Sequence, residues 1–245
     1  FATQRREVLA GVAHDEEGDT IYLVDRVSEA VLVSELAEIA RDEPLCLVAE
    51  GLPPNGLTLP PGTPDEQCRW RVLVDPIDGT RGLMYQKRPA WILTGVAPNK
   101  GPTTRLSDIV LAVQTEVPLL KQHLCDQLWA VRGRGVEARR IDRLTGTTTP
   151  LTVRPSGATR LAHGFASVSR FFPGARDVLA GIADAIVAEG EGPAVAGKAA
   201  CFEDQYISTG GQLYELIVGH DRFIADIRPM LMPILASRGL PRPLC

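Results

Sequence analysis

The chain has 245 residues, of which 44% are hydrophobic and 23% are charged, and its mean hydropathy is +0.01. The formal net charge of −4 argues against a nucleic-acid-binding protein, which would be expected to have a basic surface. The sequence has no apolar stretch of about 18 residues, so no membrane-spanning helix is predicted. The five cysteines are odd in number and widely spaced, so neither a disulfide framework nor a zinc site is predicted. We therefore expect a cytoplasmic protein with reduced thiols and with no nucleic-acid or membrane partner.

The first strongly periodic segment covers residues 26–41. Its apolar residues, among them Val31, Val33 and Leu36, recur at helical spacing, so a helix is predicted here. Asp25 stands directly before this segment and, on spacing alone, is best interpreted as the N-cap of the helix.

Residues 45–49 predict a buried strand that ends in an acid and a turn, Glu50-Gly51. Taken alone, Glu50 is as consistent with a solvated strand end as with a ligand. Residues 52–68 are rich in proline and glycine and show no periodicity, which predicts a surface loop.

A second strand, predicted over residues 70–74, runs into Asp-Pro-Ile-Asp-Gly-Thr, residues 75–80. Pro76 lacks a backbone donor and is expected to end the strand. Asp78-Gly79 is typical of a turn, and Thr80 is expected to cap a following helix.

Two carboxylates, Asp75 and Asp78, are thus predicted on one tight turn with the carbonyl of Ile77 between them. Unpaired buried carboxylates are too costly, and a hard cation between them would remove that cost. The alternative is an ordinary turn with solvated aspartates. The six-residue pattern as a whole favours the metal site.

Several further strands follow with little helix between them, which predicts a largely antiparallel sheet. They are expected over residues 90–97, 108–117, 127–132, 138–143 and 150–153. The second half of the chain predicts a strand over 163–169, an amphipathic helix over 174–189, a helical run within 202–219 and a turn into a strand that reaches Ile224.

Asp-Pro-Ile-Asp-Gly-Thr resembles the signature of the inositol monophosphatase superfamily, which also contains fructose-bisphosphatases and phosphatases of nucleotide and sulfate metabolism. The resemblance covers roughly residues 20–225 and is strongest at 70–98. It implies an α/β (α+β) fold, a layered αβαβα sandwich. A mostly antiparallel sheet and the metal site would lie in residues 1–155, and a smaller α/β half, incomplete at its C-terminus, in residues 156–245.

The resemblance also implies which residues hold metal. It assigns ligands for Mg²⁺ to Glu50, Asp75, Asp78 and the carbonyl of Ile77. Oxygen ligands of this kind suit a hard divalent cation.

The same resemblance implies how water and substrate are held. The segment around Asp25 is similar to the one whose aspartate contacts the signature threonine, so Asp25 and Thr80 would orient and deprotonate the attacking water. Asp78, Gly79 and Thr80 would bind the substrate phosphate, with backbone amides at a helix start.

The function implied is a Mg²⁺-dependent phosphomonoesterase acting on a small phosphorylated metabolite similar to inositol monophosphate. Fructose-1,6-bisphosphatase and 3'-phosphonucleotide phosphatase activities stay open as alternatives, as does a non-catalytic metal- or anion-binding relative. Lithium sensitivity and a homodimer are further implications of the resemblance.

Two departures from the superfamily pattern matter. Gly51 stands where a second glutamate is common, and a last metal-ligating aspartate is not found. Asp226 lies only five residues after Asp221, too close by the superfamily's spacing. Two explanations stay open: the last ligand lies beyond Cys245, or the site is degenerate.

Overall fold

The computed structural model describes residues 12–16, 19–193 and 195–240, with side chains from residue 28 onward in these ranges. The chain divides into two compact units. The first comprises Phe1–His14 and Ile21–Thr152, and the second comprises Asp15–Thr20 and Val153–Cys245. Each unit is described by itself.

The N-terminal strands β1 (Val12–Glu16) and β2 (Asp19–Tyr22) pair with each other. The helical elements that follow in the first unit are α2 (Leu23–Ile39), η1 (Asp65–Gln67), α3 (Thr80–Met84) and η2 (Leu106–Asp108). The strands of its main sheet are β3 (Leu45–Ala49), β4 (Leu57–Leu59), β5 (Trp70–Asp78), β6 (Ala90–Pro98), β7 (Leu111–Val117), β8 (Leu124–Val131), β9 (Gly135–Asp142) and β10 (Thr148–Pro150).

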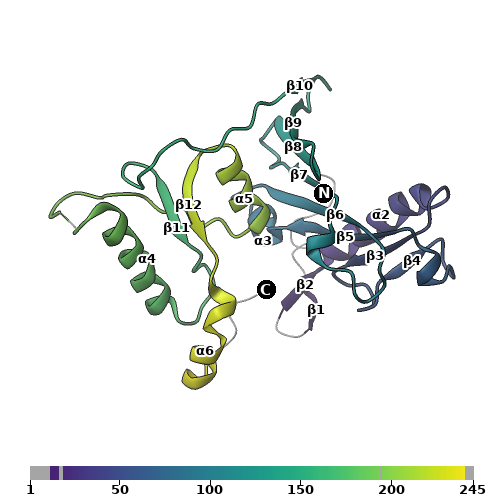
Figure 1. The fold of residues 1–245 in the computed structure, drawn as a ribbon, viewed down its shortest axis with the longest axis horizontal. Coiled ribbons are helices and arrows are strands. Elements are labelled where there is room, and N and C mark those ends of the chain that lie inside the picture. The colour runs from purple at the N-terminus through teal and green to yellow at the C-terminus, as the bar shows by residue number, and fades with distance from the viewer. Residues whose placement is uncertain (1–11, 17–18, 194, 241–245) are drawn as a thin grey trace. The chain divides into compact units, whose positions relative to one another are not determined.

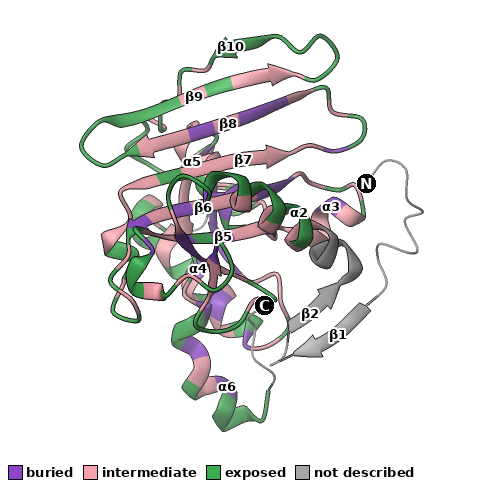
Figure 2. Cartoon of the chain, turned by 90° about the vertical axis from the view of Figure 1, so that its right-hand side faces the viewer, coloured by how far each residue is buried: buried purple, intermediate pink, exposed green. Residues whose placement is uncertain are grey.

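These eight strands form one sheet in the order β10-β9-β8-β7-β6-β5-β3-β4 (Figure 1). Every neighbouring pair is antiparallel except β3 and β5, which are parallel. Burial falls toward one edge of the sheet: β8 carries buried residues, whereas β10 is exposed along its whole length (Figure 2). The largely antiparallel sheet expected from the sequence is therefore present.

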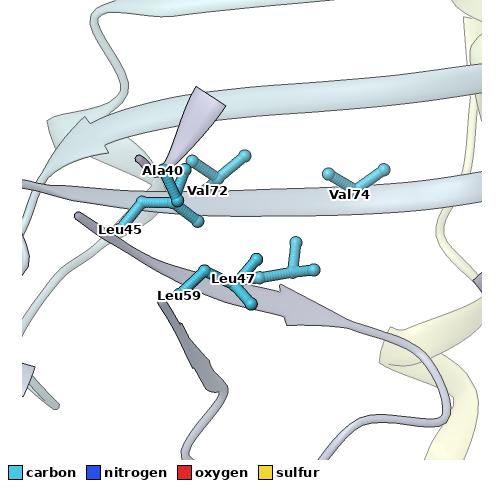
Figure 3. Close-up of a cluster of buried hydrophobic side chains, with 6 residues drawn as sticks. All are labelled: Ala40, Leu45, Leu47, Leu59, Val72 and Val74. Carbon is cyan, nitrogen blue, oxygen red and sulfur yellow. The ribbon is translucent and has the colours of Figure 1, made fainter. Parts of the chain in front are cut away.

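The main core of the first unit lies between α2 and the β3–β5 part of the sheet. Its buried members come from the residue after α2 and from three strands (Figure 3): Ala40, Leu45, Leu47, Leu59, Val72 and Val74. Leu32, Val33, Leu36 and Ala37 of α2 pack on this cluster. Helix α2 thus covers the part of the sheet that carries the ends of β3 and β5.

Two expectations for this unit are corrected. Val31, expected on the apolar face of α2, is 57% exposed, and Leu32 packs inward in its place. Residues 52–68 are not entirely loop, because Leu57–Leu59 forms β4 and pairs antiparallel with β3. The alternation in Leu-Thr-Leu points Leu59 into the core, where it is 1% exposed. Burial of this side chain stabilises the segment as a strand.

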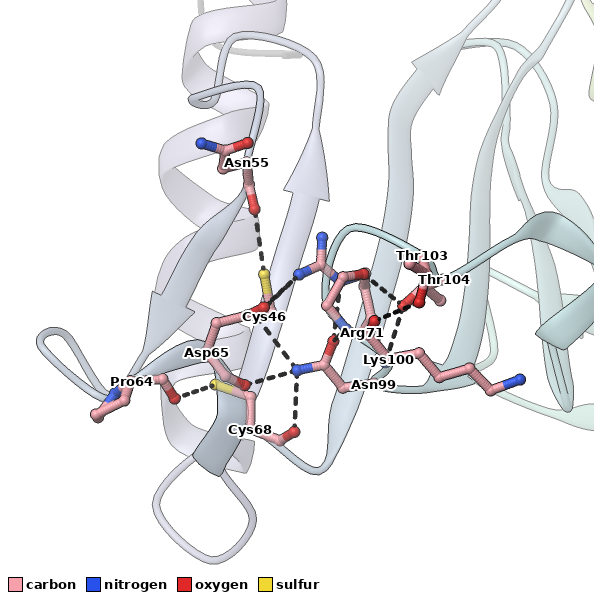
Figure 4. Close-up of polar contacts among 11 residues, drawn as sticks. Cys46, Asn55, Pro64, Asp65, Cys68, Arg71, Asn99, Lys100, Thr103 and Thr104 are labelled. Atoms are coloured by element: carbon pink, nitrogen blue, oxygen red, sulfur yellow. Dashed lines mark hydrogen bonds and ion pairs between the residues drawn. The ribbon is translucent and has the colours of Figure 1, made fainter.

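A polar network holds the remainder of this connection against the sheet (Figure 4). Arg71 of β5 donates to both oxygens of Asp65 at 2.8 and 3.0 Å, and Asn99 donates to the Asp65 and Cys68 carbonyls at 2.7 and 3.1 Å. The nearby Cys46 thiol donates to the Asn55 carbonyl, and burial raises its pKa to about 11. The network fixes residues 65–68 to the start of β5, through Arg71, and to Asn99, the residue after β6.

The second unit contains a parallel pair of strands and three helices. Its elements are β11 (Phe165–Val168), α4 (Arg176–Glu191), α5 (Thr209–Ile217), β12 (Asp221–Ala225), η3 (Arg228–Leu231) and α6 (Met232–Arg238). The core joins α4, η3, α6 and β11 through Leu179, Leu231, Leu235 and Val168.

Two details of this half differ from the sequence-based expectation. The helical run expected within residues 202–219 forms only as α5, because Ser208 caps it by accepting a hydrogen bond from the Gly211 amide at 2.8 Å. Helix α6 was not expected, although Pro233 near its start is compatible with the first helical turn.

A large, mostly antiparallel sheet with a smaller α/β unit is the fold class expected from the sequence. Across the residues that the structure describes, none of the helices combines the length and the apolar character needed to cross a membrane.

We expect Leu47→Ala to lower the free energy of unfolding by about 2–5 kcal/mol, because it opens a cavity beneath α2 where Leu47 is 0% exposed. Leu73→Ala is the matched control: it makes the same change on the neighbouring strand, where Leu73 is 40% exposed, and should cost less than about 1 kcal/mol. Urea denaturation of both variants measures the difference. Equal costs would contradict the assignment of this core.

Candidate metal centre

The segment Asp75–Asp78 ends β5 with an irregularity. Regular pairing with β6 runs to Asp75, opposite Leu93, and resumes at Asp78, opposite Trp91. The sequence analysis expected Pro76 to end the strand. Instead, Pro76 lies within β5 and interrupts its hydrogen-bonded pairing with β6. Because proline lacks an N–H, the skipped residues form a bulge that changes the direction of the strand end.

Local hydrogen bonds fix the bulge and the turn after it. The Ile77 amide donates to Asp75 Oδ1 at 3.1 Å, and the Thr80 hydroxyl donates to the Ile77 carbonyl at 2.8 Å. Gly79 has φ 95°, a left-handed conformation that favours glycine, and it is the N-cap of α3. Thr80 is thus the first residue of this helix, not its cap as expected.

Glu50 comes to the same place from β3. The parallel register pairs Ala49 with Val74, so the next residues along the two strands are Glu50 and Asp75. Carboxyl ends of neighbouring parallel strands meet at one edge of a sheet. Glu50 is exposed, whereas Asp75 is half-buried. The structure therefore brings Glu50 next to the Asp75–Asp78 turn, although 25 sequence positions separate Glu50 from Asp75.

This donor set fits a hard cation in its chemical kind. Glu50, Asp75 and Asp78 offer carboxylates, Ile77 offers a carbonyl, and magnesium and calcium prefer such oxygens. Among the described residues, no three histidine, cysteine, aspartate or glutamate side chains already gather as a ligand group. The ligand roles of these four residues stay predictions.

The expected pair of Asp25 and Thr80 is placed only in part. Asp25 lies in the first turn of α2, two residues after its start at Leu23, rather than at the N-cap position. Its side chain lies outside the described part of the chain. The role of this pair in orienting water stays a prediction.

An acid that the sequence analysis did not single out approaches this edge of the sheet. Gly51 has φ 81°, and a Cβ added to it would lie 2.6 Å from Oε2 of Glu29. Glu29 is half-buried and belongs to α2. Its distance of four residues from Asp25, about one helical turn, was the signal in the sequence that could have drawn attention to it.

Comparison with known proteins decides the fold. No protein-family model matches the sequence, and no curated protein matches it. Among solved structures, the extragenic suppressor protein SuhB from Bartonella henselae matches with a TM-score of 0.56 at 18% identity, over 89% of this chain and 70% of that one. The holo form of Leishmania major fructose-1,6-bisphosphatase matches with a TM-score of 0.57 at 13% identity, over 86% and 63%. The chain has the fold of the inositol monophosphatase superfamily.

A calcium-bound inositol monophosphatase family protein from Staphylococcus aureus gives a TM-score of 0.54 at 15% identity, over 88% of this chain and 65% of that one. The chain thus spans 63 to 70% of the lengths of these three structures. The resemblance to the inositol monophosphatase superfamily drawn from residues 75–80 is confirmed at the level of the fold.

Asp226, considered above for the superfamily's last ligand, has another partner. It directly follows β12, and its two oxygens accept from Arg228 at 2.8 and 2.5 Å. The Arg228 guanidinium also lies 4.3 Å from the ring centre of Phe171 and 5.3 Å from that of Phe172. Burial alone would raise the pKa of Asp226, but the hydrogen bonds and positive charge of Arg228 outweigh it and hold that pKa below its usual value. Asp226 therefore forms a structural ion pair.

Asp226→Asn should destabilise the protein by about 3 kcal/mol at pH 7, because it removes the negative charge that pairs with the Arg228 side chain, which is only 8% exposed. A folded pKa below the unfolded value of about 3.9 means that the unfolded state takes up the proton first as pH falls. The stabilisation that the Asp226 carboxylate provides is therefore complete above about pH 5. It is lost as the pH falls through the pKa of Asp226 in the folded protein.

Urea denaturation at pH 7 and at successively lower pH measures this loss, and the difference between wild type and variant should shrink on acidification. Asp177→Asn is the control, since its pair with Arg238 is exposed to solvent and should contribute little to stability at any pH. A difference between wild type and Asp226→Asn that does not change with pH would contradict this account.

Proposed function

We propose that the chain carries a Mg²⁺-dependent phosphomonoesterase that hydrolyses a small phosphorylated metabolite. The observation that carries the proposal is the parallel register of β3 and β5, which sets Glu50 beside Asp75 at the bulged end of β5. Three carboxylates and one carbonyl at such an edge suit divalent cations, and the fold is one in which the S. aureus neighbour binds calcium.

In this proposal, each residue has a role that follows from its position. Glu50, Asp75, Asp78 and the Ile77 carbonyl hold the cations, which when bound acidify a water and stabilise the leaving oxygen. The left-handed conformation of Gly79 turns the backbone after Asp78 and exposes no side chain there, so a phosphate can approach closely. Thr80, fixed through the Ile77 carbonyl, and Asp25 orient the attacking water.

The substrate that we favour is an inositol monophosphate-like metabolite. Fructose 1,6-bisphosphate is the first alternative, since the Leishmania neighbour is a fructose-1,6-bisphosphatase. A 3'-phosphonucleotide is the second. Five-residue α3 adds only a small helix dipole, so we expect affinity for the phosphate to depend mainly on the cations.

Three further properties belong to the same proposal. Cys46, Cys68, Cys125 and Cys201 are free thiols, which supports a reducing, cytoplasmic location. A homodimer and inhibition by lithium follow from the resemblance to the superfamily alone. Light scattering and inhibition assays on the active enzyme would test these two.

The decisive measurement is phosphate release from inositol monophosphate, fructose 1,6-bisphosphate and a 3'-phosphonucleotide, with and without Mg²⁺. We expect phosphate release by the wild type to depend on Mg²⁺, and we expect the rate to fall at least about 100-fold in Asp78→Asn. Loss of a residue that only hydrogen-bonds to a metal ligand already lowers metal affinity or activity about 10–100-fold. Asp42→Asn makes the same change at an exposed position just after α2 and should leave the rate unchanged.

Metal binding without phosphate release from any of the three substrates would favour a non-catalytic relative that binds metal or anions. The absence of a gathered ligand group among the described residues is the observation behind this second candidate. Release that does not need Mg²⁺, or that persists in Asp78→Asn, would contradict the proposed function.

A further inference from the structure

Helix α3 ends in a backbone motif that usually contains a glycine. The Gln86 amide donates to the Leu83 carbonyl at 2.9 Å, and the Lys87 amide donates to the Gly82 carbonyl at 2.9 Å. This pair of bonds is a Schellman motif, in which the residue after the C-cap is left-handed and is most often glycine, sometimes asparagine. Tyr85 is the C-cap, and Gln86 has φ 53°. A glutamine here strains the backbone, so its side chain is expected to make contacts that offset the strain.

The Gln86 side chain makes such contacts on both sides of its amide group. Its Nε2 donates to the Leu83 carbonyl of α3 at 2.9 Å, and its Oε1 accepts from the Leu120 amide at 2.8 Å. Leu120 lies in the connection between β7 and β8, residues 118–123, and is 34 positions further along the chain. Glycine would suit the backbone here but could not reach Leu120. The glutamine amide therefore bridges α3 and the β7–β8 connection.

The β7–β8 connection is itself held in place by hydrogen bonds. Gln122 accepts from the Leu119 amide at 3.3 Å, which closes the connection on itself. The Gln122 side chain also donates to Glu116 Oε1 of β7 at 2.7 Å and to the Leu124 carbonyl of β8 at 2.8 Å. Arg143 donates to the Gln122 carbonyl at 2.8 Å. The connection is thus tied to both of its strands and can serve as a fixed partner for α3.

Both α3 and this connection pack against the turn of residues 77–80, which carries part of the candidate site. One buried cluster joins them: Ile77, Leu83, Ala90 and Leu119. The Ile77 carbonyl accepts from the Thr80 hydroxyl at 2.8 Å, so these two groups keep a fixed relation to each other. Their place on the sheet is supported by Leu83 from α3 and by Leu119 from the β7–β8 connection. Gln86 joins these two supports.

We propose that Gln86 is a positioning residue for phosphate-ester hydrolysis: its bridge between α3 and the β7–β8 connection holds the turn of residues 77–80 in place. This inference rests on the proposed function, because that turn carries the Ile77 carbonyl and Thr80. Gln86 acts through α3 and contacts neither the cation nor the substrate. Without the bridge, the two supports move independently, and the turn samples more positions.

Gln86→Gly separates this role from helix capping. Glycine favours the left-handed conformation, so the Schellman motif and the folded population should be retained while the bond to Leu120 is lost. We expect kcat for phosphate release from the best of the three substrates to fall about 10-fold, since a misplacement of about 1 Å can cost about 100-fold. Gln86→Asn also suits the conformation but is one methylene too short to reach Leu120. It should lower kcat by the same factor.

Amide hydrogen exchange, followed by NMR, tests the position of the turn without turnover. The amides of Ile77, Leu83 and Leu120 all form hydrogen bonds in the wild type. All three should exchange faster in Gln86→Gly, because the turn and both supports open more often. His163→Gly is the matched control: His163 is exposed, has φ 64° and lies in the second unit. This variant should leave kcat and the three exchange rates unchanged.

Wild-type kcat in Gln86→Gly would overturn the positioning role and leave the proposed function standing. Faster exchange confined to Leu120, with wild-type rates at Ile77 and Leu83, would also overturn it, because the bridge would then be a local contact only. No phosphate release by the wild type would overturn the proposed function, and with it the role of Gln86, whatever the exchange rates.

Discussion

The parallel pairing of β3 with β5 is the constraint on which the candidate site depends. All other neighbouring strands of the main sheet are antiparallel, so this is the one pair in it whose carboxyl ends meet. A shift of one residue in its register would turn either the buried Leu47 of β3 or the buried Val72 of β5 outward, and it would separate Glu50 from Asp75. The core beneath α2 therefore fixes the chemistry at the strand ends as well as the stability of the unit.

The bulge at Pro76 adds a second constraint at the same edge. A regular strand would point Asp75 and Asp78 to opposite faces, because their separation is odd. The interrupted ladder and the bonds from Ile77 and Thr80 replace that alternation with a fixed turn. Strand irregularities of this kind are common next to functional sites, where they redirect side chains.

The sequence predicted β5 and β6 because their burial is encoded locally, in runs of β-branched and aromatic residues. It missed β4, and the strand expected over residues 150–153 forms instead as the exposed β10, Thr148–Pro150. It failed where tertiary contacts decide the outcome. Val31 and Leu32 have similar hydrophobicity, and only the packing of α2 on the sheet determines which is buried. The approach of Glu29 to Gly51 is equally invisible in the sequence, since it depends on how α2 crosses the end of β3. Helix α6 was missed because prolines at 229 and 233 obscured its pattern.

The connection between β3 and β5 is held along much of its length, by β4 at one end and by the network of Asp65, Arg71 and Asn99 at the other. A free loop of this length would allow its two flanking strands to slide, and the entropy of that motion would oppose any precise arrangement at their ends. Anchoring the connection removes this freedom when the unit folds. Glu50 and Asp75 are thus preorganised: little conformational entropy remains to be lost when a ligand arrives, and a larger share of its interaction energy appears as affinity.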